Sequence, residues 1–178
     1  MRQPTILQII GKDDAPVVQE NEGLEVWDLF AGAGGFSTGA AAAGCRVAFV
    51  CDANANALRT HAQNHPSAKH CHCKLPQPLP LPTDGRRFHL HGSPPCQSFS
   101  QMRAKAPPTQ AELEASTCLV AWFIDLALSS RATSWSMEEV AQKGVLSIVK
   151  KKHKEYGGRF AYAVIPLYRL GGPQTRIR

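Results

Sequence analysis

The sequence predicts an α/β fold in which helices flank a mostly parallel sheet. Two apolar runs, at 24–30 and 45–52, are each followed by a segment with a helical pattern. A glycine-rich turn lies between the first run and its helix. This strand–helix–strand–helix order is typical of parallel sheets, whose crossover connections are helices.

The first half of the chain gives the clearest elements. "LEVWDLF" (24–30) is typical of a buried strand, and "AGAGGFSTGAAAAG" after it predicts a glycine turn followed by an alanine-rich helix. "CRVAFVCD" (45–52) predicts a second strand. "ANALRTHAQNH" (55–65) predicts a helix that ends at Pro66.

The second half continues the pattern after an interruption. Residues 74–87 carry four prolines at alternate positions, which predicts an extended loop. The segments after it are expected to be a strand at 88–92, a long helix at 112–130, a strand at 132–140, an amphipathic helix at 144–156 and a strand region at 159–170.

Composition bounds the class of protein. A chain of 178 residues that is 43% hydrophobic is long enough for one globular domain, which we place at 24–178 after a polar leader at 1–23. The longest apolar run is broken by Asp125, and no secretory signal precedes it. We expect an intracellular protein with no membrane partner and with reduced cysteines. The net charge of +6 is compatible with a polyanionic partner.

The glycine turn predicts a nucleoside site. Gly32, Gly34 and Gly35 lie between strand and helix, where glycines let the backbone approach a ligand closely. Asp52 ends the next strand, where a carboxylate can accept both ribose hydroxyls. The spacing lacks the third glycine of dinucleotide sites, so a ligand without a pyrophosphate is favoured. The alternative is a tight structural turn with a structural aspartate.

The stretch "GSPPCQSFS" (92–100) predicts a stiff loop around a thiol. Pro94 and Pro95 fix the backbone before Cys96, at the carboxyl end of a predicted strand, where α/β sheets hold their ligands. A cysteine held there is a candidate nucleophile. The alternative is a surface turn with a passive cysteine.

The stretch "HCHC" (70–73) invites a zinc interpretation that we do not favour. Its spacing is too tight for four ligands, and no second cysteine or histidine pair stands at zinc-finger distance. We therefore expect no metal site.

Four motifs, "DLFAGAGGFSTG", "GSPPCQSFS", "MEEV" and "GGPQTRIR", occur in the order found in cytosine-5 DNA methyltransferases, and the chain resembles that family over most of 24–178. The resemblance implies a Rossmann-like S-adenosylmethionine-dependent methyltransferase fold. It also implies that the chain lacks the family's C-terminal target-recognition region, as a fragment, a degenerate copy or one half of a split enzyme.

The resemblance implies a role for each matched residue. Cys96 would be the nucleophile that attacks C6 of a flipped cytosine, Glu138 the acid on the base, and Arg176 and Arg178 supporting arginines. Contacts to the base would come from Pro95, Gln97, Ser98 and Gln174. Contacts to S-adenosylmethionine would come from Asp28, Phe30, Ala31, Gly32, Gly34, Gly35, Phe36, Asp52, Ala53 and Pro94.

The implied partners are duplex DNA and, for a split enzyme, a complementary chain that carries the recognition region. Without that region, sequence-specific reading of DNA has no evident carrier in this chain. Two other functions stay open: an RNA (tRNA) cytosine-5 methyltransferase, and a catalytically inactive DNA-binding or scaffold protein. Glu139 stands where the family usually has asparagine.

Overall fold

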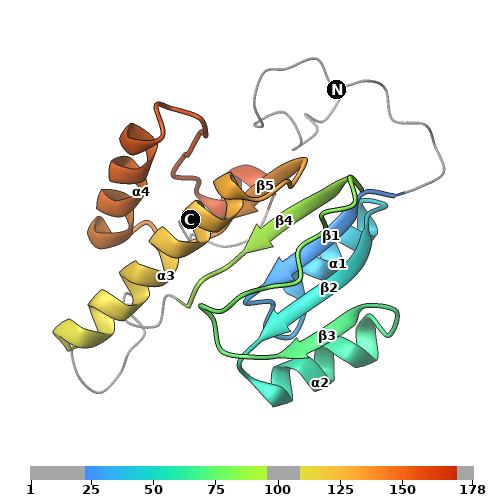
Figure 1. Cartoon of the computed structure of the whole chain (residues 1–178). Helices are drawn as coiled ribbons and strands as arrows, with labels where there is room; N and C mark the ends of the chain where they lie inside the picture. Colours follow the sequence, from blue (N-terminus) through green and yellow to red (C-terminus); the bar gives the residue numbers. More distant parts are fainter. Residues whose placement is uncertain (1–22, 96–108, 172–178) are drawn as a thin grey trace.

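The first apolar run forms β1 (Glu25–Leu29), the central strand of a parallel sheet in the computed structural model (Figure 1). The structure describes residues 23–95 and 109–171. Within them the sheet has five strands in the order β3-β2-β1-β4-β5, and every neighbouring pair is parallel. The predicted fold class is therefore confirmed.

The other elements follow the predicted order closely. They are α1 (Gly35–Ala42), β2 (Arg46–Asp52), α2 (Ala55–Asn64), β3 (Lys69–His72), β4 (Phe88–Gly92), α3 (Gln110–Ser129), β5 (Ser134–Met137), α4 (Lys143–Glu155) and a 3-10 turn, η1 (Leu167–Leu170). No helix in the described ranges is long and apolar enough to cross a membrane.

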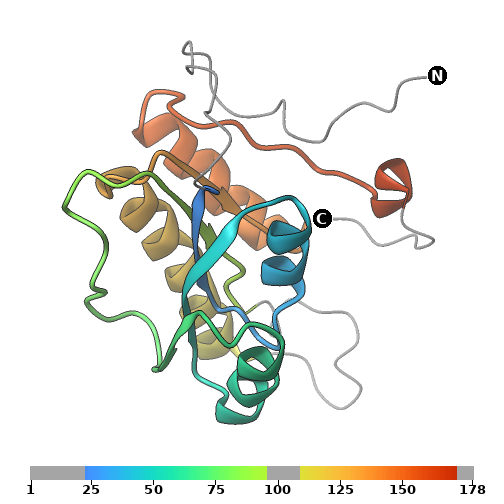
Figure 2. The same cartoon turned by 90° about the vertical axis from the view of Figure 1, so that its right-hand side faces the viewer.

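Helices cover both faces of the sheet, with α1 and α2 on one side and α3 on the other (Figure 2). Alternate residues of each strand face opposite sides, so β1 sends Trp27 and Leu29 into the core under α3. The Trp27 ring stacks on Phe49 of β2, with 4.4 Å between ring centroids. α4 packs against α3 through a second apolar cluster that includes Val120 and Val149.

Gly92 ends β4 where the Phe123 ring of α3 packs directly against the strand. A Cβ atom at this position would lie 2.3 Å from the Phe123 ring, a separation that no real contact allows. Phe123 is fully buried in the core beneath α3. The absence of a side chain at Gly92 therefore lets α3 pack at the end of β4.

Asp28 places a carboxyl group inside the fold, on the α1 side of β1. Its side chain is 1% exposed, and its Oδ2 accepts a hydrogen bond of 2.6 Å from the Ser37 hydroxyl of α1. Its Oδ1 is buried without a hydrogen-bond partner. Burial above all, with a smaller effect of Asp52, raises the pKa of Asp28 to about 7.

The structure corrects one prediction and adds one strand. Residues 159–170 were expected to be a strand region, but they form no strand and end in η1. Their alternating apolar residues have β propensity, but they join none of the sheet's strands in the described ranges, and only a single β-bridge occurs, at Pro166. Phe160 instead packs on Trp135 and His153, and Pro166 has no backbone N–H for a ladder.

The added strand is β3, which pairs with β2 as the edge of the sheet. Its four residues, two of them histidine, have little of the apolar pattern that marks a strand.

We expect Gly92→Ala to destabilise the protein by about 1–3 kcal/mol, because the new methyl group overlaps the Phe123 ring. Urea unfolding measures the change. Gly39→Ala is the control, since a Cβ there meets nothing within 4 Å and alanine favours the helix. Equal stabilities of the two variants would contradict this packing.

We expect Asp28→Asn to remove a pH dependence from the free energy of unfolding. The folded pKa of about 7 lies above the ordinary value of 3.8, so the wild type loses stability as pH rises between these values. The slope approaches about 1.4 kcal/mol per pH unit. The variant should therefore gain on the wild type from pH 5 to 7, with no further gain above pH 7. Parallel curves over this range would contradict the buried carboxyl.

Candidate functional site

Four strands bring several of the predicted site residues to one edge of the sheet. Because the strands are parallel, β1, β2, β4 and β5 end at the same edge. Backbone bonds extend the pairing beyond the strand ends: the Ser93 N–H donates to the Leu29 carbonyl at 3.2 Å, and the Glu138 N–H donates to the Gly92 carbonyl at 3.1 Å. Four features thus leave adjacent strands: the glycine turn, Asp52, Glu138 and the stiff loop of Ser93, Pro94 and Pro95, which we call the proline shelf.

The glycine turn is tight and unusual in its backbone. Phe30 begins it with φ 60°, a left-handed value that costs a non-glycine residue roughly 1–2 kcal/mol. Gly34 then has φ 102° and donates its N–H to the Ala31 carbonyl at 3.0 Å. A Cβ at Gly34 would also lie 3.0 Å from the His61 ring. Both the backbone angle and the imidazole beneath it require glycine there.

Asp52 ties this turn to the next strand. Its Oδ2 accepts from the Gly32 N–H at 2.8 Å, and its Oδ1 accepts from the Asn54 N–H at 2.7 Å. Asn54 in turn caps α2, since its side chain accepts from the Asn56 and Ala57 N–H groups. One carboxylate therefore holds the glycine turn and the start of α2 in a fixed relation.

The same geometry fits a nucleoside cofactor. A Cβ on Gly32 or Gly35 would meet no atom within 4 Å, so this side of the turn is open. A carboxylate accepts about four hydrogen bonds, and Asp52 uses two for the backbone. The remaining lone pairs can accept ribose hydroxyls. These residues fit S-adenosylmethionine better than a dinucleotide, because the turn lacks the third glycine of a pyrophosphate site.

A cluster of three histidines lies beneath the turn. His61 is fully buried, and its Nδ1 lies 2.9 Å from His70 Nε2. Burial, followed by His65 and His70, lowers the pKa of His61 to about 4. The ring under Gly34 is therefore neutral at pH 7. We did not predict this residue, although its position three after the buried Leu58 marks the core face of α2.

A second polar network joins β4 to β5. His89 lies 2.8 Å from the hydroxyls of both Ser134 and Ser136, and His91 reaches Ser136 at 2.8 Å. Phe36 of α1 stacks on the His91 ring at 3.4 Å between centroids. Burial above all lowers the pKa of His91 to about 3. A neutral, hydrogen-bonded layer thus supports the strands that carry the shelf and Glu138.

The predicted site residues fall into three groups. The first group is exposed or half-buried at the carboxyl edge and consists of Phe30, Ala31, Gly32, Gly35, Asp52, Ala53, Pro95 and Glu138. The second group is buried there and consists of Asp28, Gly34 and Pro94. Phe36 is half-buried against His91. The third group lies outside the described residues and consists of Cys96, which we expect to be the nucleophile, with Gln97, Ser98, Gln174, Arg176 and Arg178. Glu139 is half-buried, and its Oε2 accepts from the Val140 N–H.

The solved structures that match this chain include three methyltransferases. A DNA modification methyltransferase encoded within an Escherichia coli prophage is 25% identical, with a TM-score of 0.63 over 87% of this chain and 44% of that one. A Mesorhizobium loti S-adenosylmethionine-dependent methyltransferase (23%, TM-score 0.36, 47% of this chain and 39% of that one) is also similar. So is Schizosaccharomyces pombe Dnmt2 (17%, TM-score 0.48, 86% and 46%). The chain thus spans less than half of each of these proteins. No curated protein matches the sequence.

The family model of the C-5 cytosine-specific DNA methylases matches residues 24–178. That range contains the whole described sheet, the glycine turn, the proline shelf and Glu138. The chain therefore belongs to the C-5 cytosine-specific DNA methylase family.

Proposed function

We propose that this chain provides the cofactor site and the nucleophile for methyl transfer to C5 of cytosine in DNA. The observation that carries the proposal is the meeting of two motifs at one edge of the sheet. The glycine turn with Asp52 leaves β1 and β2, and the shelf leading to Cys96 leaves β4, the strand paired with β1 on its other side. A donor and an attacking group would therefore be neighbours.

S-adenosylmethionine, when bound, supplies the methyl group. Asp52 would accept the ribose hydroxyls while its backbone bonds keep the turn in place. The open face at Gly32 and Gly35 admits the ligand close to the main chain. Asp28 lies underneath and holds α1 through Ser37. These roles require that the hydrogen bonds of Asp52 to Gly32 and Asn54 exist before the ligand binds, and the structure has both bonds.

Cys96 and Glu138 would act on the base. Cytosine C5 is a poor nucleophile, and addition of the Cys96 thiolate to C6 makes C5 electron-rich. The Glu138 carboxyl group would stabilise the charge that develops at N3. Loss of the C5 proton then lets the thiolate leave. The cytosine must be flipped out of the duplex for this attack, because C5 and C6 are not reachable while the base is stacked in the duplex.

The comparison with one solved structure favours DNA as the substrate, and the charge of the chain is compatible with any nucleic acid. The fold neighbour that is 25% identical is a DNA modification methyltransferase. The chain is also basic, with a net charge of +6, and α4 ends in the exposed lysines Lys150, Lys151 and Lys154. Positive groups of this kind bind phosphates without reading sequence. Because the chain spans 44% of that neighbour, we propose that a complementary segment or chain supplies target recognition.

Covalent trapping tests the proposal. Duplex DNA that contains 5-fluorocytosine retains the enzyme, because fluorine cannot leave C5 as a proton does. With S-adenosylmethionine added, the wild type should form a denaturation-resistant adduct, and Cys96→Ser should reduce it by at least a hundredfold. Cys118→Ser is the matched control, since Cys118 is an exposed thiol on α3.

Two outcomes would count against the proposal. If the wild type forms no adduct even with the complementary region supplied, the chain is not the catalytic part of the enzyme. If tRNA is methylated and duplex DNA is not, the substrate is RNA.

A further inference from the structure

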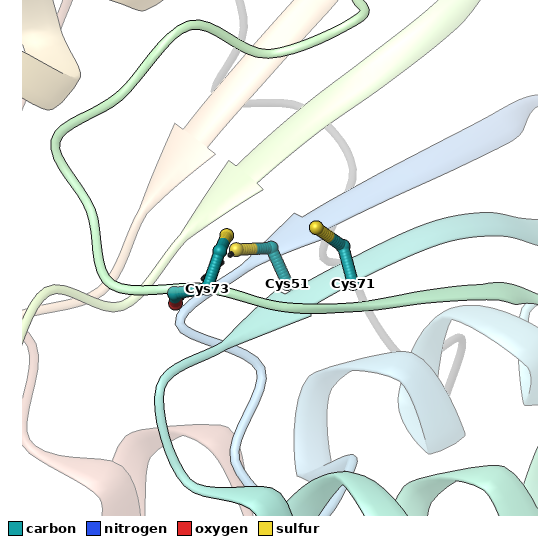
Figure 3. Close-up of side chains that lie close together, drawn as sticks. All are labelled: Cys51, Cys71 and Cys73. Atoms are coloured by element: carbon teal, nitrogen blue, oxygen red, sulfur yellow. Dashed lines mark hydrogen bonds between the residues drawn. The ribbon is translucent and has the colours of Figure 1, made fainter.

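Three cysteine thiols outside the proposed active site converge at the edge of the sheet. Cys51 lies near the end of β2, Cys71 in β3, and Cys73 directly after β3. Their three Sγ atoms all lie within 4.8 Å of one another (Figure 3). All three cysteines are free.

The strand register explains this convergence. Cys51 and Cys71 are direct partners across the parallel β2–β3 pair. Cys73 follows Cys71 by two residues, and its N–H continues the ladder to the Asp52 carbonyl at 3.1 Å. Residues two apart on a strand face the same side, so the three thiols share one face. The backbone of two adjacent strands therefore holds the cluster in place.

The histidines of the same stretch face away from the thiols. His70 bonds to His61 of α2, and His72 Nε2 lies 3.0 Å from the Ala53 carbonyl. The alternation of "HCHC" along a strand thus separates imidazoles from thiols. The result is a donor set of sulfur alone, which favours soft metal ions over Mg²⁺ or Ca²⁺.

The thiol cluster lies at the margin of the apolar core. Cys51 is fully buried in that core, and the half-buried side chains packed against the core include Cys71 and Cys73, with Leu79 and Leu81 of the proline-rich loop. Burial raises the pKa of Cys51, with a further contribution from Cys73. A buried thiol of this kind, as at Cys51, is protonated and poorly reactive as a nucleophile. A metal ion that displaces the protons would instead be held by sulfur ligands at the margin of the core.

We propose that Cys51, Cys71 and Cys73 bind one thiophilic metal ion, of the class that includes Zn²⁺, Cd²⁺ and Cu⁺, through three thiolates. Metal–sulfur bonds of about 2.3 Å place the ligand sulfurs roughly 3.8 Å apart, so the thiols need to draw together by about 1 Å at most. Each thiol releases one proton to solvent on binding. The ion would fasten the edge strand β3 to β2 immediately before Asp52.

Cadmium titration of a reduced, metal-free protein tests the site. The background carries Cys45→Ser, Cys96→Ser and Cys118→Ser, so that the cluster holds the remaining thiols. Thiolate-to-cadmium charge-transfer absorbance should saturate at one equivalent. A further Cys71→Ser or Cys73→Ser change should weaken binding at least tenfold. These two positions are half-buried, which makes their variants safer for folding than Cys51→Ser.

Thermal unfolding supplies a second, independent readout. Saturating Cd²⁺ should raise the unfolding midpoint of the background protein, because the ion binds the folded state, and should not raise it in the Cys73→Ser variant. The site would be refuted if the background bound Cd²⁺ no more tightly than the two single-site variants. An unchanged midpoint in the background at saturating Cd²⁺ would equally refute it.

Discussion

The carboxylate of Asp52 is the contact on which the rest of the site depends. Its two oxygens accept the N–H groups of Gly32 and Asn54, which belong to the turns after β1 and β2. Hydrogen bonds to an ionised acceptor are about twice as strong as neutral ones. This pair of bonds fixes the glycine turn, with its left-handed Phe30, against β2, the strand that Asp52 ends. The unfavourable backbone of Phe30 persists because its surroundings determine it.

The sheet connects the glycine turn to the strands that precede the proline shelf and Glu138. β1 pairs with β2 on one side and β4 on the other, so the turn and the proline shelf leave adjacent strands. Gly92 lets α3 pack at the end of β4, and the histidine–serine network joins β4 to β5. A buried polar layer of this kind is stable only when its members are hydrogen-bonded, as these imidazoles and hydroxyls are. The residues that we propose to hold the cofactor and the substrate therefore share one rigid support.

The sequence predicted β1 and β2 because each is a mostly apolar run that is followed directly by a helix. It also predicted β4 and the segment that contains β5, although these strands are less apolar. It could not predict β3, since "KHCH" is short and polar and is a strand only by pairing with β2. The prediction for residues 159–170 was wrong for the opposite reason, because this segment has the apolar alternation of a strand but does not join the sheet. The thiol cluster could not be predicted because Cys51 is distant in sequence from Cys71 and lies beside it only through the register of β2 and β3. Roles placed on Cys96, Arg176 and Arg178 stay predictions, as these residues lie outside the described ranges.

The binding of S-adenosylmethionine to Asp52→Asn, measured by isothermal titration calorimetry, tests the central claim most directly. Asparagine keeps the shape of the side chain but loses its charge and one of its two acceptor atoms, so affinity should fall by about 10- to 100-fold. Asp84→Asn is the control, because Asp84 is exposed in the proline-rich loop and bonds to Arg86. Wild-type affinity in Asp52→Asn, with an unchanged fold by circular dichroism, would contradict the claim that this carboxylate organises the cofactor site.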